Sequence, residues 1–280
     1  MKKSDVCAVI TTFCPEDSII ENLSLVLKQV GFVVIVNDSG KEFGILSQIN
    51  SDSVVVINNP NNVGIARSLN LGVDYADCLG FDFILTLDDD SLLDANYVEK
   101  LYDFFSENHT CLACGVYDSG KNYSVPFKKK QVVITSGSLF KVHDYKMIDG
   151  FSEAMFIDYV DFDFCLRLAN KTKLDIFEVY TAKFNHQIGE SSNVDEGKFL
   201  KLSSFDHSPF RIYYQTRNLF FMVKKFILSN PIFSLYIARN LVLLPLKIIL
   251  VDTNKNEKIK FFLKGFRDGL LGRMGRLNNE

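Results

Sequence analysis

The sequence predicts an α/β fold with a mostly parallel central sheet, helices on both faces of the sheet, and a helical C-terminal region. Three observations lead to this prediction. Apolar segments of strand length alternate with amphipathic helical segments between residues 6 and 90, a pattern typical of parallel sheets with right-handed crossovers. Each of these apolar segments ends in polar residues. The composition then changes after about residue 207, where apolar helical segments carry many cations.

The first half of the chain supplies the predicted parallel strands. Residues 6–12, 32–36, 54–57 and 81–87 are nearly continuous apolar runs, as expected of strands buried on both faces. The segments between them, residues 15–30, 43–49 and 64–77, place their apolar residues at helical spacing. Because the carboxyl ends of parallel strands lie at one edge of a sheet, the polar residues there are expected to form one continuous ledge.

The middle of the chain predicts shorter elements. We expect a helix at residues 94–105 and strands at 111–116 and 131–135, around a basic loop at 128–130. A tight turn at 136–138, a helix that opens at Asp161, and closing strands at 174–180 and 184–186 follow. Residues 189–206 are polar and without periodicity, which predicts a mobile loop close to the site.

The C-terminal region predicts helices at residues 208–228, 232–251, with a break near Pro245, and 257–271. Its cations are mixed with phenylalanine and leucine, which is typical of amphipathic helices lying on a membrane surface. A soluble helical pack or a contact between two copies of the chain remains an alternative. The expected domains are therefore residues 1–206 and 207–280.

Composition limits the class of protein. The 280 residues carry a net charge of −3, which argues against a general nucleic-acid binder. The six cysteines are scattered, which predicts free thiols in a reducing compartment. Cys111 and Cys114 have C-x-x-C spacing but no second pair to complete a zinc site. The short apolar run after the N-terminus is expected to be a first strand and not a signal peptide.

The fourth predicted strand ends in three consecutive acids, Asp88, Asp89 and Asp90. Three adjacent carboxylates repel one another, so a cation is expected beside them. In an extended segment Asp88 and Asp90 point to one side and Asp89 to the other. The pair Asp88 and Asp90 is therefore suited to a hard divalent ion, although a solvated acidic turn is the alternative.

Several motifs together resemble the family-2 glycosyltransferases with the GT-A fold. Residues 62–72 (NVGIARSLNLG) look like the family's N-x-G-x-A-x-x-x-N-x-G signature, and residues 87–91 (LDDDS) look like its D-x-D. Residues 160–167 (VDFDFCLR) resemble its E-D-x-D-x-x-x-R segment, with Val160 in place of the glutamate. Residues 156–161 (FIDYVD), 213–218 (YYQTRN) and 269–273 (GLLGR) are closest to the bacterial rhamnosyltransferase branch.

The resemblance implies an inverting sugar transfer from a nucleotide-sugar, assisted by Mg²⁺ or Mn²⁺. It implies Asp88, Asp90 and His186 as metal ligands. Thr11 and Thr12 would line the nucleoside pocket, and either Asn37 or Asp38 would face the base. Arg67 would reach a phosphate or the base, or is a surface cation. Asn62 and Asp89 complete the expected nucleotide-sugar contacts.

On the acceptor side, alignment of the motif through Arg167 places Asp161 at the family's general-base position. An inverting transfer needs one carboxylate to accept the proton of the attacking hydroxyl, although Asp161 could also be a structural acid. We expect Asp158 and Arg217 in the acceptor site, and Asp163 either there or holding the helix.

The branch resemblance favours L-rhamnose from dTDP-L-rhamnose as the donor, and a UDP-sugar such as UDP-galactofuranose is the alternative. The acceptor is expected to be a lipid-linked glycan of bacterial surface polysaccharide (O-antigen or capsule), at the cytoplasmic face of the membrane. Two rival hypotheses are weaker. A nucleotidyltransferase would need a basic glycine-rich loop after the first strand, and a non-catalytic scaffold would lack the base or the D-x-D.

Overall fold

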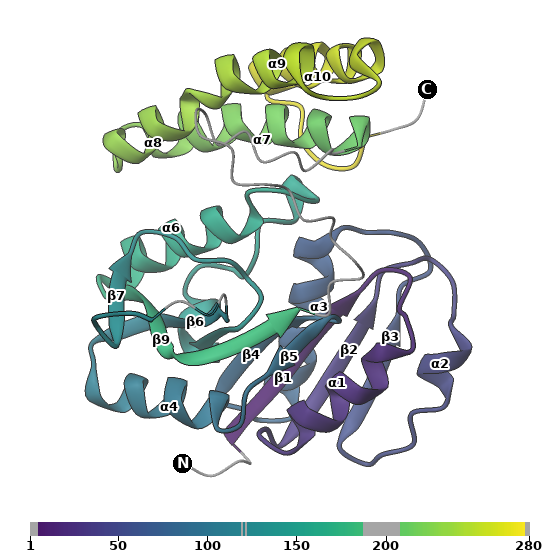
Figure 1. The fold of residues 1–280 in the computed structure, drawn as a ribbon, viewed down its shortest axis with the longest axis vertical. Coiled ribbons are helices and arrows are strands. Elements are labelled where there is room, and N and C mark those ends of the chain that lie inside the picture. The colour runs from purple at the N-terminus through teal and green to yellow at the C-terminus, as the bar shows by residue number, and fades with distance from the viewer. Residues whose placement is uncertain (1–4, 119, 121, 187–207, 278–280) are drawn as a thin grey trace. The chain divides into compact units, whose positions relative to one another are not determined.

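The computed structural model describes residues 5–118, 120, 122–186 and 208–277, and it confirms the α/β fold (Figure 1). The chain divides into two compact units. The N-terminal unit comprises Met1–Ser152 and Asp161–Gly189, and the C-terminal unit comprises Glu153–Val160 and Glu190–Glu280. The expected domain boundary at residue 206 lies outside the described residues.

The N-terminal unit is built on a nine-stranded mixed sheet in the order β3-β2-β1-β4-β8-β6-β9-β5, with β7 paired to β9. Strands β3, β2, β1 and β4 are mutually parallel, as predicted. The remaining pairs are antiparallel except for β6 with β9. The strands are β1 (Val6–Thr12), β2 (Phe32–Asn37), β3 (Val54–Asn58), β4 (Phe83–Asp88), β5 (Ser91–Leu93), β6 (Thr110–Tyr117), β7 (Phe127–Lys130), β8 (Ser138–Lys141) and β9 (Asp175–His186).

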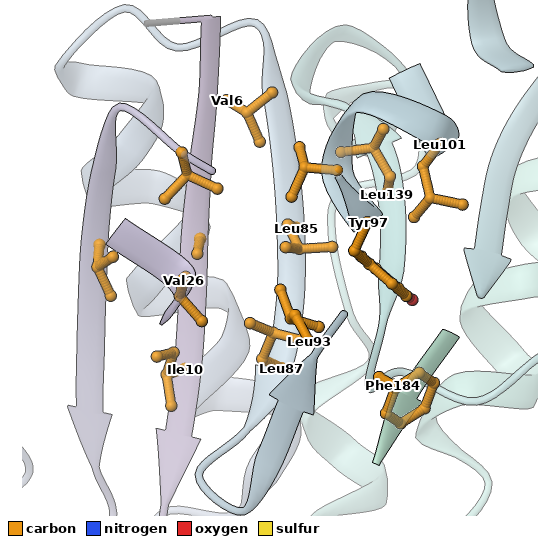
Figure 2. Close-up of a cluster of buried hydrophobic side chains, with 14 of the residues drawn as sticks. Val6, Ile10, Val26, Leu85, Leu87, Leu93, Tyr97, Leu101, Leu139 and Phe184 are labelled. Carbon is orange, nitrogen blue, oxygen red and sulfur yellow. The ribbon is translucent and has the colours of Figure 1, made fainter. Parts of the chain in front are cut away.

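Helices cover both faces of this sheet. They are α1 (Ser18–Leu27), α2 (Gly44–Ser47), α3 (Ile65–Cys78), α4 (Tyr97–Glu107), α5 (Val142–Lys146) and α6 (Val160–Thr172). Because side chains alternate along a strand, Val6, Ala8 and Ile10 of β1 join a core with α1 and α4. Figure 2 shows part of this cluster, including Val26 of α1 and Leu101 of α4. Val9, on the opposite face, packs under Gly72 of α3.

The middle of the chain differs from the prediction in two places. The strand lies at β7 (Phe127–Lys130) and not at residues 131–135, so the expected basic loop is itself a strand. Its lysines pair with acids of the neighbouring strand β9, Lys129 with Asp175 and Lys130 with Glu178. The two expected closing strands form one continuous strand, β9.

The C-terminal unit contains α7 (Pro209–Phe226), α8 (Pro231–Ala238), α9 (Asn240–Leu250) and α10 (Lys255–Leu270). The break in the apolar segment falls at Arg239, and Pro245 lies inside α9, contrary to the prediction. α10 packs closely on α7, since a Cβ at Gly265 would lie 2.5 Å from the carbonyl oxygen of Tyr213. The expected mobile loop at 189–206 lies outside the described residues.

Gly72 lets α3 approach the central strand, and replacing it tests that contact. A Cβ at Gly72 would lie 2.4 Å from Cγ1 of Val9, so Gly72→Ala should lower the free energy of unfolding by about 1–3 kcal/mol through overpacking. The measurement is urea unfolding followed by circular dichroism. Gly44→Ala is the matched control, because a Cβ there meets no atom within 4 Å. Equal stability of the two variants would show that the sheet does not need this close packing.

Candidate active site at the carboxyl ends of the parallel strands

The predicted polar ledge is present in the N-terminal unit. Strand pairing aligns Thr12 with Asn37, and Asn37 with Asn58, at the carboxyl ends of β1, β2 and β3. Thr11 pairs with Asp88 at the end of β4. The sheet therefore brings the four polar strand ends to one edge, which is where ligands bind in open α/β sheets.

The acid triplet forms a turn. Strand β4 ends at Asp88, and β5 begins at Ser91. The two residues between them, Asp89 and Asp90, form the turn. The alternation expected of an extended segment thus stops at Asp88. Asp89 is directed toward β1, where the Thr12 hydroxyl donates a hydrogen bond to its carboxylate. Burial, and to a lesser degree the charge of Asp90, raises the pKa of Asp89, while the hydrogen bond from Thr12 partly offsets that rise.

The triplet is suited to a divalent cation that also contacts a ligand. In the described part of the chain, no group of three or more His, Cys, Asp or Glu side chains is arranged to hold a metal ion. Mg²⁺ is commonly held by one or two carboxylates together with substrate phosphates, so Asp88 and Asp90 fit this kind of site. Strand pairing sets the backbone of His186 opposite Ser91, directly after the triplet.

Asp38 and Asn37 both have partners within the protein. The Asp38 carboxylate accepts hydrogen bonds from the backbone N–H groups of Val63 (2.8 Å) and Gly64 (2.9 Å) and from Asn59 (2.9 Å). Asn37 is 0% exposed, and its amide donates to Asn58 and to the carbonyl of Lys41. Its burial removes Asn37 from the residues that a base can touch, so of the two only Asp38 remains a candidate.

The N-x-G signature has a structural explanation. Gly64 adopts a φ of +89°, which favours glycine, and its N–H also donates to Asn62. Asn70 exchanges two hydrogen bonds with the backbone of Phe151, and Gly72 packs against β1. These residues shape the loop before α3 and secure the helix, whereas Arg67 is exposed in its first turn.

Asp161 lies in the first turn of α6 and is half-buried. Its Oδ1 accepts a hydrogen bond from the backbone N–H of Phe162 (2.9 Å). The residue lines a small cavity with threonine, serine and aromatic side chains, among them Thr86, Ser138 and Phe151. The cavity therefore places an apolar surface beside the carboxylate that we expect to act as a base.

Asp163 is a correction to the acceptor prediction. Its side chain is 0% exposed and pairs with Nε of Arg167 at 2.6 Å. Arg167 also donates to the carbonyl oxygens of Ile148 and Gly150 at 2.5 and 2.7 Å. Asp163 therefore holds α6 through Arg167, which is the other role expected of it, and it has no surface for an acceptor.

The C-terminal unit contains a strained segment that α7 holds in place. Phe156, Asp158 and Tyr159 have φ values of +67°, +62° and +64°, a region that costs non-glycine residues about 1–3 kcal/mol each. Asn218 donates to the carbonyl oxygens of Met155 (3.0 Å), Ile157 (2.7 Å) and Asp158 (2.9 Å). These bonds fix a backbone conformation that the residues themselves do not favour.

Two further residues of α7 hold the same segment. Arg217 is 1% exposed and donates to the carbonyl oxygens of Ala154, Met155 and Gly275, so the acceptor contact predicted for Arg217 is corrected to a buried structural role. Arg211 pairs with Asp158 at 2.7 Å. The Asp158 carboxylate therefore already has a cationic partner, Arg211, within its own unit.

Sequence reasoning missed two residues that contact the triplet. Asn22 of α1 donates to the backbone carbonyl of Asp89 at 2.7 Å. The Ser136 hydroxyl accepts from the N–H of Asp88 at 3.0 Å. Asn22 lies among the apolar residues of an amphipathic helix, and Ser136 lies in a segment predicted only as a turn, so neither carries a sequence signal for this role.

Comparison with known proteins gives consistent matches. The sequence profile of Glycosyl transferase family 2 matches residues 7–165. The chain is 27% identical over 298 residues to the dTDP-rhamnosyl transferase RfbF of Shigella flexneri, covering 97% of each chain.

Solved structures share the fold. TarS of S. aureus (residues 1–349) in complex with UDP-GlcNAc matches with a TM-score of 0.51 and 16% identity, over 96% of this chain and 73% of that one. GalNAc-T7 with UDP, GalNAc and Mn²⁺ matches with a TM-score of 0.56 and 10% identity. That match covers 65% of this chain and 44% of GalNAc-T7.

The three hydrogen bonds from Asn218 to the strained segment predict a large effect of one substitution. Asn218→Ala should lower the free energy of unfolding by about 2 kcal/mol, because the carbonyl oxygens of Ile157 and Asp158 lose this donor and that of Met155 keeps only Arg217. Thermal unfolding of the purified protein measures this. Asn256→Ala, on the exposed side of α10, is the control and should change stability by less than about 0.5 kcal/mol. A similarly small effect of both substitutions would contradict the stabilising role of the Asn218 hydrogen bonds.

Proposed function

The chain belongs to glycosyl transferase family 2, and we propose that it transfers L-rhamnose from dTDP-L-rhamnose to a hydroxyl of a lipid-linked glycan, with inversion at the anomeric carbon. The observation that carries the proposal is the similarity to a dTDP-rhamnosyl transferase, which extends over 97% of both chains. The polar ledge and the acid triplet at the carboxyl ends of the parallel strands support a nucleotide-sugar as the ligand.

Donor binding is assigned to the ledge. The carboxylate of Asp38 lies at the end of β2, and its Oδ2 accepts a hydrogen bond from the N–H of Gly64. A carboxylate oxygen can accept a second bond, so Asp38 is suited to the ring N3–H of thymine or uracil. Thr11 lies beside Asp88 and contributes to the nucleoside wall. The exposed guanidinium of Arg67 is suited to a phosphate.

The cation is assigned to Asp88 and Asp90, with His186 as the proposed third ligand. Mg²⁺ or Mn²⁺ bound there would neutralise the negative charge on the leaving diphosphate. An imidazole ligand makes Mn²⁺ more suitable than it is at an all-oxygen site.

Asp161 is the proposed general base. In an inverting transfer it accepts the proton of the acceptor hydroxyl while that oxygen attacks the anomeric carbon. The N–H of Phe162 holds one carboxylate oxygen, Oδ1, which restricts the rotation of the group. Asp163, paired with Arg167 within the same helix, secures the first turn that carries Asp161.

The C-terminal unit is proposed to hold the protein on an anionic membrane surface, where a lipid-linked acceptor lies. Pro231–Leu250 is long and apolar enough to cross a membrane, and only 22% of its most apolar window is buried. Arg239 interrupts it near its middle, which is costly in a membrane core and suits a helix pair lying in the interface. The exposed apolar side chains of α8 and α9 are Ile232, Leu235, Tyr236, Val242, Leu243, Leu246, Ile249 and Leu250.

Cations accompany this apolar surface. Each basic residue near an anionic membrane surface contributes about 1 kcal/mol of attraction, so the apolar and basic side chains would act together. The exposed cations of α7, α8–α9 and the α10 region include Lys224, Lys225, Arg239, Lys255, Lys260, Arg267, Arg273 and Arg276.

The base assignment predicts a separation of binding from transfer. Asp161→Asn keeps the shape of the side chain but cannot accept the proton, so transfer should fall by at least about 100-fold, while the affinity for dTDP stays within about twofold. Rhamnose transfer to membrane extracts and calorimetric titration with dTDP measure the two quantities. Glu153→Gln, in the C-terminal unit, is the control. Transfer by Asp161→Asn at the wild-type rate would remove Asp161 from the mechanism.

Membrane attachment predicts that the wild-type protein sediments with vesicles of phosphatidylcholine and phosphatidylglycerol but not with phosphatidylcholine alone. The double variant Leu246→Asp, Ile249→Asp should lose this binding, because both side chains are exposed on α9. Leu79→Asp, exposed in the N-terminal unit, should bind like the wild type. A different result would assign this surface to self-association: the wild-type protein does not bind vesicles and is a dimer, and the α9 double variant is a monomer.

A further inference from the structure

We propose that Thr12, Asn22 and Ser136 are positioning residues that set the shape of the acid turn, and that Asp89 is its internal anchor and not a contact to the donor. The inference rests on the proposed cation at Asp88 and Asp90. It differs from the expectation that Thr12 and Asp89 both touch the nucleotide-sugar, because the structure directs these two side chains toward each other.

Ser136 closes the turn at both ends. Its hydroxyl oxygen accepts from the backbone N–H of Asp88 at 3.0 Å, and it shares a 2.8 Å hydrogen bond with the hydroxyl of Ser91. Asp88 and Ser91 are the residues on either side of the two-residue turn. Ser136 is 3% exposed and Ser91 is 1% exposed, so water does not compete for these bonds. One buried hydroxyl thereby fixes the span of the turn.

Ser136 is itself held against β4. The Thr86 hydroxyl donates to the carbonyl oxygen of Thr135 at 2.6 Å, and the N–H of Gly137 donates to the carbonyl oxygen of Thr86 at 2.8 Å. The residues on both sides of Ser136 are therefore attached to the strand that leads into the triplet. The position of the Ser136 hydroxyl follows from β4 and not from the turn that it closes.

Asp89 fixes the middle of the turn from the opposite side. Thr12 of β1 donates to its carboxylate, and the buried amide of Asn22 in α1 donates to its carbonyl oxygen at 2.7 Å. The side chain and the main chain of one residue are thus bound by two different elements. Asp89 cannot rotate toward a ligand without breaking the bond to Thr12.

These contacts matter because the neighbouring carboxylates repel one another. Like charges a few ångströms apart disfavour the arrangement in which Asp88 and Asp90 converge on one ion. A turn held at both ends and in its middle limits how far Asp88 and Asp90 can move apart before the cation arrives. Removal of an outer partner of a metal ligand typically lowers metal affinity by about 10- to 100-fold.

The test measures Mn²⁺ directly, by electron paramagnetic resonance of the free ion, in the presence of dTDP. Thr12→Val removes the hydroxyl and keeps the shape, whereas Thr12→Ser keeps the hydroxyl. We expect Thr12→Val and Ser136→Ala to raise the Kd for Mn²⁺ by about 10- to 100-fold, and Thr12→Ser to stay within about threefold. Ser106→Ala, exposed on α4, is the control. Saturating Mn²⁺ should restore most of kcat in Thr12→Val, which a general loss of structure would not allow.

Asp90→Ala separates this inference from the function that it rests on. If Asp90→Ala loses Mn²⁺ while Thr12→Val and Ser136→Ala bind it like the wild type, the positioning role is wrong and the metal site stands. If Asp90→Ala binds Mn²⁺ like the wild type, both are wrong. The inference holds if Asp90→Ala abolishes binding and the two hydroxyl variants weaken it with a wild-type unfolding temperature in the absence of metal.

Discussion

The repulsion among three adjacent carboxylates at the end of β4 is the constraint on which the rest of the site depends. The fold places this charge at the carboxyl end of a central strand, because β4 pairs with β1 on one side and with β8 on the other. Asp89 is drawn away by Thr12, which divides the triplet into one anchored carboxylate and two at the proposed cation site. A nucleotide diphosphate carries the same sign of charge, so the proposed cation is what joins an acidic protein to an anionic donor.

The same sheet edge explains the family signature between residues 62 and 72. The Asp38 carboxylate accepts hydrogen bonds from the N–H groups of Val63 and Gly64. Asn70 links α3 to the backbone of Phe151 by two hydrogen bonds. The signature therefore describes how a loop and a helix are attached to β2 and β1. Its residues fix the loop and the helix, and the nearby Asp38 and Arg67 are suited to contact a donor.

The sequence predicted the parallel half of the sheet well, because strands buried on both faces leave continuous apolar runs. It failed at Phe127–Lys130, where lysines form a strand because acids of β9 lie opposite, and at Arg239, where the helix breaks without a proline. Charge led us to expect an acceptor contact for Arg217, and for Asp163 as one of two alternatives, whereas both side chains are buried and hydrogen-bonded within the protein. Burial of a charged residue is a property of the tertiary structure, and neither local spacing nor a motif indicates it.

Release of the nucleotide from a set of donors tests the central claim most directly. The purified protein is supplied with dTDP-L-rhamnose or with UDP-sugars, including UDP-galactofuranose, and with membrane extract as acceptor, in Mn²⁺ and in excess chelator. We expect release of dTDP from dTDP-L-rhamnose, its loss in chelator, and its recovery when Mn²⁺ or Mg²⁺ is restored. Turnover at the same rate in chelator would contradict the role given to the acid triplet, and turnover of a UDP-sugar alone would contradict the donor.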